Sequence, residues 1–361
     1  MNPLNKIQQH GQSIWLDLLD RDIMNSGKLK NLIDNDDLRG LTSNPSIFEK
    51  AITGSSDYDK DIAEYSKKEN DNSAIFFDLA ITDIQQAADI FKPVFEKTNG
   101  GDGFVSLEVS PLLARDTEGT IKQARNLWKR VNRKNVMIKI PGTKEGLPAI
   151  RKCLSEGINI NVTLLFGLPR YREITEAFMS GLEDRLKAGE SIENVASVAS
   201  FFLSRIDVMV DPILKEKNAN TLLGKVAIAS AKKAYQIYLE MISSDRFKKL
   251  QEQGAQLQRV LWASTSAKDP NFSDVIYVEN LIGKDTINTL PLETIDAFRD
   301  HGKVTDSLTE GIDEANKVMD DLKNLGINID EITQKLEDEG IEKFNQAYDK
   351  LLKSIDNQKQ K

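Results

Sequence analysis

The chain has 361 residues, of which 29% are charged and 40% hydrophobic, a composition typical of a globular protein with one or two domains. The 48 basic and 56 acidic side chains give a formal net charge of −8. This balance argues against a nonspecific nucleic-acid binder, because such binding depends on clustered Lys and Arg. A single cysteine, Cys153, excludes an intramolecular disulfide, and two histidines with one cysteine cannot make a His/Cys zinc centre. We therefore expect no metal site.

The N-terminal segment and the hydropathy give no sign of export or membrane insertion. Residues 1–11 are polar, no export-signal core follows them, and no run reaches 18 apolar residues without a charge. Neither a Walker A loop nor a Gly-x-Gly-x-x-Gly fingerprint occurs, and we interpret Gly100-Gly101-Asp102-Gly103 as a turn. We therefore expect a cytoplasmic protein without membrane or nucleic-acid partners, which uses no cofactor and does its chemistry with its own side chains.

Eight short runs typical of β-strands alternate with long amphipathic segments along the chain. The predicted strands are Ser13–Leu19, Leu38–Asn44, Gly103–Ser110, Asn135–Ile140, Asn159–Phe166, Ala196–Leu203, Arg259–Thr265 and Thr286–Leu290. The helical segments between them include Asp71–Lys97, Thr117–Asn132, Glu145–Glu156, Leu168–Lys187 and Leu222–Ile242. Strands that alternate with helices form parallel βαβ units, and eight such units predict a closed (β/α)₈ TIM barrel.

The C-terminal region continues the helical pattern beyond the eighth strand. Residues 306–353 predict two or three charged amphipathic helices, and residues 358–361 are expected to fray. No Pro-, Gly- or Ser-rich linker divides the chain, so we expect one elaborated barrel domain over residues 1–361, with residues 306–361 as a helical extension packed on it. An apolar stripe with Ile341, Phe344 and Leu351 either packs on the barrel or forms a dimer interface, which leaves both a monomer and a homodimer open.

Most predicted strands have one apolar and one polar face. In Gly103–Ser110, for example, Val105 and Leu107 alternate with Ser106 and Glu108. Polar faces would point to water in a half-exposed sheet, but helices cover the outer face of a barrel, so here they should point inward. The residues expected inside, near the C-terminal strand ends, are Asp17, Asn44, Glu108, Lys139, Asn161, Thr163 and Ser200. Barrel enzymes keep their chemistry at that end, so a shared catalytic pocket explains these polar residues best.

Lys139 is the strongest single indication of chemistry, because it lies among residues expected to be buried. A desolvated lysine amine can attack a carbonyl carbon and form a Schiff base. Glu108 and Asp17 would then supply carboxylates that move protons to and from the substrate. The alternative is structural: Lys139 is neutralised by these two acids, or its amine reaches the rim of the barrel.

Five segments in register resemble the transaldolase family. Leu41-Thr42-Ser43-Asn44-Pro45-Ser46 is similar to its Thr-Ser/Thr-Asn-Pro-Ser signature, and residues 138–143, followed by Glu145-Gly146, resemble the segment of its Schiff-base lysine. Residues 157–166 match the next strand, and Asp17 and Glu108 fall where the family has its two catalytic acids. The resemblance extends from about residue 13 to residue 301. The chain length, Trp15 and the segment of residues 262–270 are more similar to the longer bacterial-type branch.

The resemblance implies a pentose-phosphate-pathway transferase that moves a dihydroxyacetone unit from a ketose phosphate to an aldose phosphate. The donor would be sedoheptulose 7-phosphate or fructose 6-phosphate, and the acceptor glyceraldehyde 3-phosphate or erythrose 4-phosphate. By position, Lys139 forms the imine, Asp17 takes the proton of the C4 hydroxyl, and Glu108 and Thr163 position a water that shuttles protons. Asn44, Asn161 and Ser200 would bind the hydroxyls of the fragment, and no metal or cofactor is needed because the iminium accepts the electrons.

Phosphate recognition is assigned to residues that follow the sixth and seventh strands. Arg205 matches the family's phosphate-binding arginine, and a bidentate arginine–phosphate contact gives the physical reason; the alternative is a salt bridge with Asp207 or Asp211. Ser264 and Lys268 are assigned by position alone, because loops after the late strands of barrels often bind phosphate; the alternative is a simple loop role. Gly142, which stands where shorter members have Ala or Ser, and a longer segment between Phe166 and Ala196 set this chain apart from them.

Two other functions remain open. A class I aldolase-type lyase would use the same lysine but release free dihydroxyacetone or its phosphate. A catalytically silent barrel would only bind ligands or partners, although Asp17, Glu108, Lys139 and Thr163 are all present together, which favours an enzyme.

Overall fold

A closed barrel of eight parallel strands forms the centre of the computed structural model, which describes residues 2–359. Each strand pairs with the next one in the chain, and the first pairs with the last, as the (β/α)₈ prediction requires. The strands are β1 (Gln12–Asp17), β2 (Gly40–Thr42), β3 (Phe104–Glu108), β4 (Val136–Pro141), β5 (Ile160–Leu165), β6 (Ser197–Phe202), β7 (Gln258–Ala263) and β8 (Thr286–Leu290). All eight predicted strands are confirmed: the bounds of β8 are as predicted, and the ends of the other seven differ by one or two residues.

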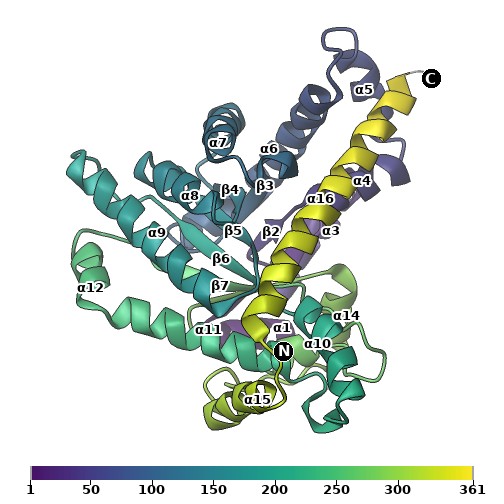
Figure 1. Cartoon of the computed structure of the whole chain (residues 1–361). Coiled ribbons are helices and arrows are strands. Elements are labelled where there is room, and N and C mark those ends of the chain that lie inside the picture. Colours follow the sequence, from purple (N-terminus) through teal and green to yellow (C-terminus); the bar gives the residue numbers. More distant parts are fainter. Residues whose placement is uncertain (1, 360–361) are drawn as a thin grey trace.

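Helices surround the barrel and cover the apolar outer faces of its strands (Figure 1). In the first half of the chain they are α1 (Pro3–Ile7), α2 (Arg21–Asn25), α3 (Lys28–Asp36), α4 (Pro45–Gly54), α5 (Asp59–Tyr65), α6 (Asn72–Lys97), α7 (Thr117–Val131) and α8 (Gly146–Ser155). In the second half they are α9 (Leu168–Lys187), α10 (Ser204–Glu216), α11 (Val226–Ser243), α12 (Asp245–Glu252), α13 (Ile276–Glu279), α14 (Leu292–His301), α15 (Ile312–Asn324) and α16 (Ile329–Lys359). Short 3₁₀ turns occur at Gln8–His10, Pro111–Leu113 and Asn220–Leu222.

The inside of the barrel is packed at its N-terminal end, where the Trp15 indole fills the space between strands. Trp15 is fully buried, and its Nε1 donates a hydrogen bond to Asp102 at 3.2 Å. Gly40 on the neighbouring strand leaves room for this ring, because a Cβ at that position would lie 2.5 Å from the indole. The barrel therefore has a closed lower layer, and the polar inward residues farther along the strands lie above it.

Helix α16 passes across the C-terminal end of the barrel, in yellow in Figure 1, and then follows α4 and α6. The apolar stripe of Ile341, Phe344 and Leu351 is buried within the chain. Residues 358 and 359 were expected to fray, and this was wrong: Gln358 donates to the Ile52 carbonyl at 3.3 Å and Lys359 to the Asn70 carbonyl at 2.8 Å, so the helix continues to Lys359. The rest of that expectation concerns residues 360–361, which lie outside the described part.

No helix within residues 2–359 is both long enough and apolar enough to cross a membrane.

Candidate active site

A cavity of about 320 Å³ opens at the C-terminal ends of the strands. Its walls come from β1, β4, β6, from the loops after β2, β7 and β8, and from α16. Seven of the ten residues predicted for the site line this cavity: Asp17, Asn44, Lys139, Ser200, Arg205, Ser264 and Lys268. The position agrees with the general rule that the catalytic side chains of such barrels lie at this end.

Lys139 and Glu108 form a buried charge pair at the base of the site. They are direct neighbours in the register of β3 and β4, and their side chains are only 5% and 4% exposed. The Lys139 Nζ lies 3.5 Å from Glu108 Oε2 and donates a hydrogen bond to the Ser43 carbonyl at 2.9 Å. Burial raises the pKa of Glu108 to about 7, although the positive charge of Lys139 opposes the change. Glu108 can therefore both accept and give up a proton near neutral pH.

Asp17 ends β1, which is separated from the strand of Glu108 by β2 alone. Burial raises the pKa of this carboxyl, and the charge of Lys139 and a hydrogen bond from Thr42 oppose the change. The Thr42 hydroxyl donates to Asp17 Oδ1 at 2.7 Å and lies 2.8 Å from the hydroxyl of Thr289, which must then donate to Thr42. Asp17 is thus held by a short chain of hydroxyls from β2 and β8.

The two remaining inward polar residues of β5 have different surroundings. Asn161 donates to the Ser106 hydroxyl at 3.0 Å and accepts from Ser200 at 2.7 Å, so three strands are joined below the cavity. The buried hydroxyl of Thr163 has no hydrogen-bond partner within residues 2–359. A register shift between Val162 and Leu165, with Leu164 at φ 53°, lies directly beside Thr163. Strand irregularities and strained backbone of this kind re-aim side chains near functional sites.

Glu108, Asn161 and Thr163 are buried but do not themselves form the cavity wall. Lys139 and Ser200 do line the cavity, and they contact Glu108 and Asn161 respectively. The structure joins Glu108 to Lys139 and Asn161 to Ser200, whereas no hydrogen bond among the described residues joins Thr163 to Glu108.

Asn44 has a double role, because it is also the N-cap of α4. Its side-chain oxygen accepts from the Ile47 amide at 3.0 Å, a common way to satisfy the first turn of a helix. The side-chain amide group remains available to a ligand in the cavity.

Arg205, at the second position of α10, faces the cavity without a carboxylate partner. The predicted alternative, a salt bridge with Asp207 or Asp211, does not form: Asp207 accepts from Tyr277 at 2.7 Å and from the Ala227 amide at 2.8 Å, and Asp211 accepts from the Gly224 amide. Among the described residues, the buried Arg205 Nη1 has no hydrogen-bond partner, and burial lowers the pKa of its guanidinium. A buried donor of this kind is costly unless a ligand accepts from it.

Ser264 and Lys268 also line the cavity, but their polar groups are partly engaged. The Ser264 hydroxyl lies 2.8 Å from that of Ser204, and the Lys268 Nζ donates to Ser266 at 2.5 Å. Of the three residues predicted to bind phosphate, Arg205 is therefore the most available to a ligand in the cavity.

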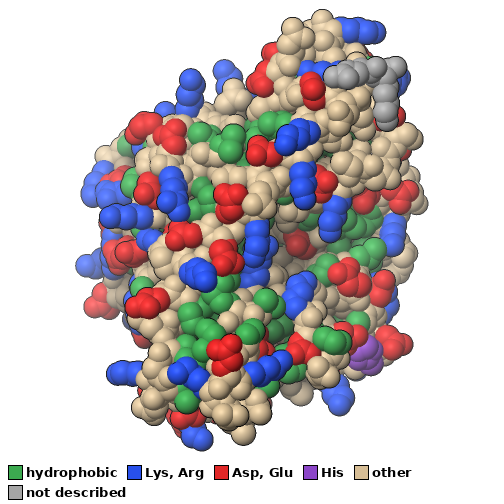
Figure 2. Space-filling view, turned by 45° about the vertical axis from the view of Figure 1, so that its right-hand side comes forward, with side chains coloured by type: hydrophobic (Ala, Val, Ile, Leu, Met, Phe, Trp, Pro, Cys, Tyr) green, Lys and Arg blue, Asp and Glu red, His purple; other side chains and the backbone are tan. Residues whose placement is uncertain are grey.

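The cavity is lined by six ionisable groups, four of them cationic: Lys50, Lys139, Arg205 and Lys268, against Asp17 and Glu293. Among the described residues, neither Lys50 nor Arg205 forms an ion pair. Figure 2 shows acidic and basic side chains mixed over the visible face, so the positive cavity is a local feature of a chain with net charge −8. Such a cavity attracts anionic ligands.

Several cavity residues were missed in the sequence: Thr42, Lys50, Thr289, Glu293 and Phe344. The sequence gives partial indications for two of them: Thr42 lies on the polar face of a predicted strand, and Phe344 lies in the apolar stripe of the C-terminal helices. Lys50 and Glu293 lie on exposed helical positions and look like ordinary surface charges in the sequence.

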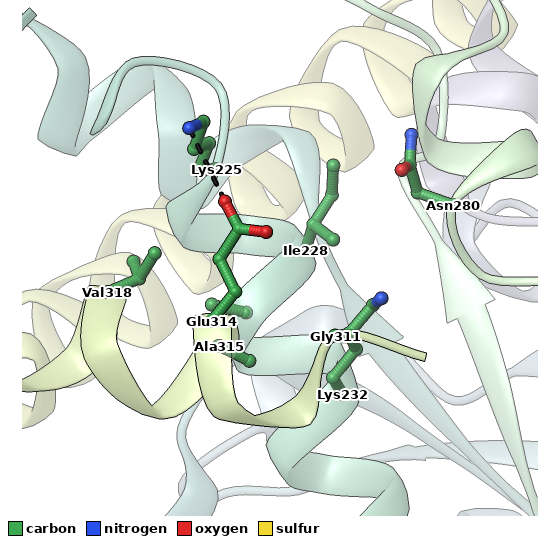
Figure 3. A pocket seen from close by; sticks show the side chains of 9 residues that line it. Lys225, Ile228, Lys232, Asn280, Gly311, Glu314, Ala315 and Val318 are labelled. Carbon is green, nitrogen blue, oxygen red and sulfur yellow. Dashed lines mark ion pairs between the residues drawn. The ribbon is translucent and has the colours of Figure 1, made fainter. Parts of the chain in front are cut away.

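A second hollow, of about 160 Å³, lies between α11 and α15 and is shown in Figure 3. Lys225 there pairs with Glu314 at 3.6 Å, and the Lys232 amine donates to the carbonyls of Ser307 and Glu310. The protein itself thus satisfies these groups, and no predicted site residue lines this hollow. Within residues 2–359, no group of three or more His, Cys, Asp or Glu side chains is arranged to hold a metal ion.

Comparison with known proteins identifies the family of the chain. Residues 14–355 match the family described as Transaldolase/Fructose-6-phosphate aldolase. The chain is 48% identical to a transaldolase of Trichodesmium erythraeum over 98% of this chain and 97% of that protein. It is 48% identical to transaldolase 2 of a Nostoc species, over 99% of this chain and 97% of the relative, and 42% identical to a transaldolase of Thiobacillus denitrificans, over 98% and 100%. The chain belongs to the transaldolase/fructose-6-phosphate aldolase family and is an enzyme of the transaldolase type.

Proposed function

We propose that this enzyme transfers a dihydroxyacetone unit between sugar phosphates through a Schiff base on Lys139. The observation that carries the proposal is the buried Lys139 amine, 3.5 Å from a carboxyl whose pKa is raised to about 7, at the base of a positively charged cavity. The donor is sedoheptulose 7-phosphate or fructose 6-phosphate, and the acceptor is glyceraldehyde 3-phosphate or erythrose 4-phosphate.

The first half of the reaction forms the imine. Lys139 gives up a proton to Glu108, and its amine attacks the C2 carbonyl of the ketose to give a carbinolamine. Glu108 then returns a proton to the C2 hydroxyl, which leaves as water and gives the iminium. Thr163, whose hydroxyl has no hydrogen-bond partner in the described part of the chain, would hold a water between Glu108 and the substrate. A carboxyl with a pKa near 7 suits both directions of proton transfer.

The second half breaks and remakes a carbon–carbon bond. Asp17 takes the proton of the C4 hydroxyl, the C3–C4 bond breaks, and its electron pair moves into the iminium to give an enamine. The shortened aldose phosphate leaves. The acceptor aldehyde then adds to the enamine, Asp17 returns its proton to the new C4 hydroxyl, and hydrolysis of the iminium frees Lys139.

Asn44, Asn161 and Ser200 hold the hydroxyls of the three-carbon fragment in this proposal, and Arg205 holds the phosphate, assisted by Ser264 and Lys268. The unpaired Arg205 Nη1 supports its role, because a phosphate oxygen would satisfy that donor. The protein acts in the cytoplasm as a monomer or homodimer; each catalytic group named here comes from a single chain.

A lyase with the same lysine is the second candidate, because the matching family includes fructose-6-phosphate aldolases as well as transaldolases. The two differ in whether an aldehyde acceptor or water takes the fragment. Incubation with fructose 6-phosphate, with and without erythrose 4-phosphate, separates them. We expect sedoheptulose 7-phosphate with the acceptor and little free dihydroxyacetone without it; release at a comparable rate without acceptor would favour the lyase.

A further inference from the structure

The loop between β2 and α4 brings a main-chain carbonyl to the reacting nitrogen. The carbonyl oxygen of Ser43 accepts a hydrogen bond from Lys139 Nζ at 2.9 Å, closer than the carboxylate of Glu108 at 3.5 Å. Ser43 is fully buried. The amine therefore has a hydrogen bond to an acceptor that cannot ionise and a charge-pair contact with a carboxyl that can, and neither oxygen of that carboxyl accepts a hydrogen bond among the described residues.

The side chain of the same serine fixes the position of that carbonyl. The Ser43 hydroxyl donates to the main-chain carbonyl of Ser106 at 2.7 Å. Ser106 lies on β3, two residues before Glu108 and on the same inward face. One hydroxyl thus ties the loop that carries the carbonyl to the strand that carries the acid, and sets the spacing of both from Lys139.

Little else ties this loop to β3. The register of β2 with β3 extends only over Gly40 and Leu41, so the strand pairing ends before Ser43. On either side of Ser43, the Thr42 side chain is engaged with Asp17 and that of Asn44 with the first turn of α4. The Ser43 hydroxyl is consequently the contact that holds the loop against the strand of the catalytic acid.

We infer that Ser43 is a positioning residue for Lys139, acting through the hydrogen bond from its hydroxyl to Ser106 and from Lys139 to its carbonyl. The inference rests on the proposed Schiff-base function. The nitrogen carries three hydrogens as an ammonium, two as a free amine and one as a substituted iminium. At least one N–H therefore remains for the Ser43 carbonyl in each state, while Glu108 exchanges the proton that comes and goes. The carbonyl keeps the lone pair of the free amine directed at the substrate.

The test compares Ser43→Ala with Ser43→Thr, which retains a hydroxyl, and with Ser197→Ala as a matched control. Ser197 is also a buried barrel serine that donates to a main-chain carbonyl, that of Ile160 at 2.9 Å, but it lines the opposite end of the barrel. Ser43→Ala loses one buried hydrogen bond, and Ser197→Ala loses two, because the Ser197 hydroxyl also accepts from Gln258 Nε2 at 2.9 Å. A merely structural role therefore predicts an effect at least as large in Ser197→Ala as in Ser43→Ala.

We expect Ser43→Ala to lower kcat about 10- to 100-fold with a small change in KM, because misplaced reacting groups slow chemistry more than binding. The rate of borohydride trapping with fructose 6-phosphate should fall by the same factor, and the limb of the pH profile that reports Glu108 should move. Ser43→Thr should recover most of the rate, and Ser197→Ala should keep the kcat and pH profile of the wild type.

A wild-type kcat and pH profile in folded Ser43→Ala would overturn the inference. If that variant does not fold, Ser43→Cys carries the test, because the thiol keeps the shape and is a weaker donor; a wild-type rate and pH profile there would be equally decisive. The wild-type protein separates the two proposals: no lysine adduct in the wild type overturns the proposed function, whereas equal trapping rates in wild type and Ser43→Ala overturn only the role of Ser43.

Discussion

Glu108 is a carboxyl with almost no contact with water, whose only nearby compensating charge is the amine of Lys139. Its raised pKa, about 7, means that the folded protein holds a proton that the unfolded chain releases near its ordinary value of 4.5. Between these two values the folded state binds more protons than the unfolded state. The contribution of Glu108 to stability is therefore fully present below about pH 4.5 and is lost as the pH rises through 7.

Replacement of Glu108 by Gln should remove this pH dependence together with most of the activity. Relative to the wild type, Glu108→Gln should gain stability, on the order of 1–3 kcal/mol, as the pH rises from 5 to 8. Urea unfolding of both proteins at several pH values measures the difference. A constant difference across that range would show that Glu108 does not titrate there.

Arg205 provides a second test at the level of single residues. Arg205→Ala should raise KM for fructose 6-phosphate about 10- to 100-fold, because a buried phosphate contact is lost, and should leave the kinetics with unphosphorylated fructose or dihydroxyacetone unchanged. Arg172→Ala, which removes an exposed arginine paired with Glu240, is the control. An equal loss with phosphorylated and unphosphorylated substrates would place Arg205 outside phosphate recognition.

The sequence predicts the strand residues of the site well and the loop residues poorly. Glu108, Lys139, Asn161 and Ser200 follow from alternation along strands, because side chains two apart share a face. No such period governs the loop after β2, so the Ser43 carbonyl could not be foreseen as a partner of Lys139. Lys50 and Glu293 were missed for a related reason: a charged residue on an exposed helical position has the same local pattern whether or not a cavity lies beside it.

Among the elements, α16 does more than extend the barrel. Its residue Phe344 lines the cavity with Lys139 and Arg205, although some 200 positions of sequence separate Phe344 from Lys139. The sequence correctly predicts helices in this region, and a helical period indicates which side chains of α16 are buried. It does not indicate which part of the barrel they cover, because that depends on the path of the chain after β8.

Removal of the Phe344 ring should therefore affect both stability and chemistry. Phe344→Ala should cost about 3 kcal/mol of folding stability and raise the release of free dihydroxyacetone relative to transfer, because water gains access to the iminium. Phe247→Ala in α12, where a fully buried ring packs on Phe178 of α9, is the matched control. If both variants lose similar stability and Phe344→Ala keeps the wild-type ratio of free dihydroxyacetone to transfer product, then α16 does not limit the access of water to the iminium.

At the scale of the molecule, the net charge of the chain and the local charge of the cavity have opposite signs. The net charge of −8 argues against a nonspecific nucleic-acid binder, but it does not describe the cavity, where cations outnumber acids four to two. The barrel explains this contrast: strands from distant parts of the sequence end at one site, and the loops that follow them bring Arg205 and Lys268 together. Only the closed fold places these residues beside Lys139.

The most direct test of the proposed function is borohydride reduction of the enzyme with fructose 6-phosphate, followed by peptide mass spectrometry. We predict a reduced dihydroxyacetone adduct on the peptide that contains Lys139, absent from Lys139→Met and from samples without sugar. An unmodified Lys139 in an enzyme that still transfers dihydroxyacetone, or an adduct on another lysine, would contradict the Schiff-base mechanism proposed for this site.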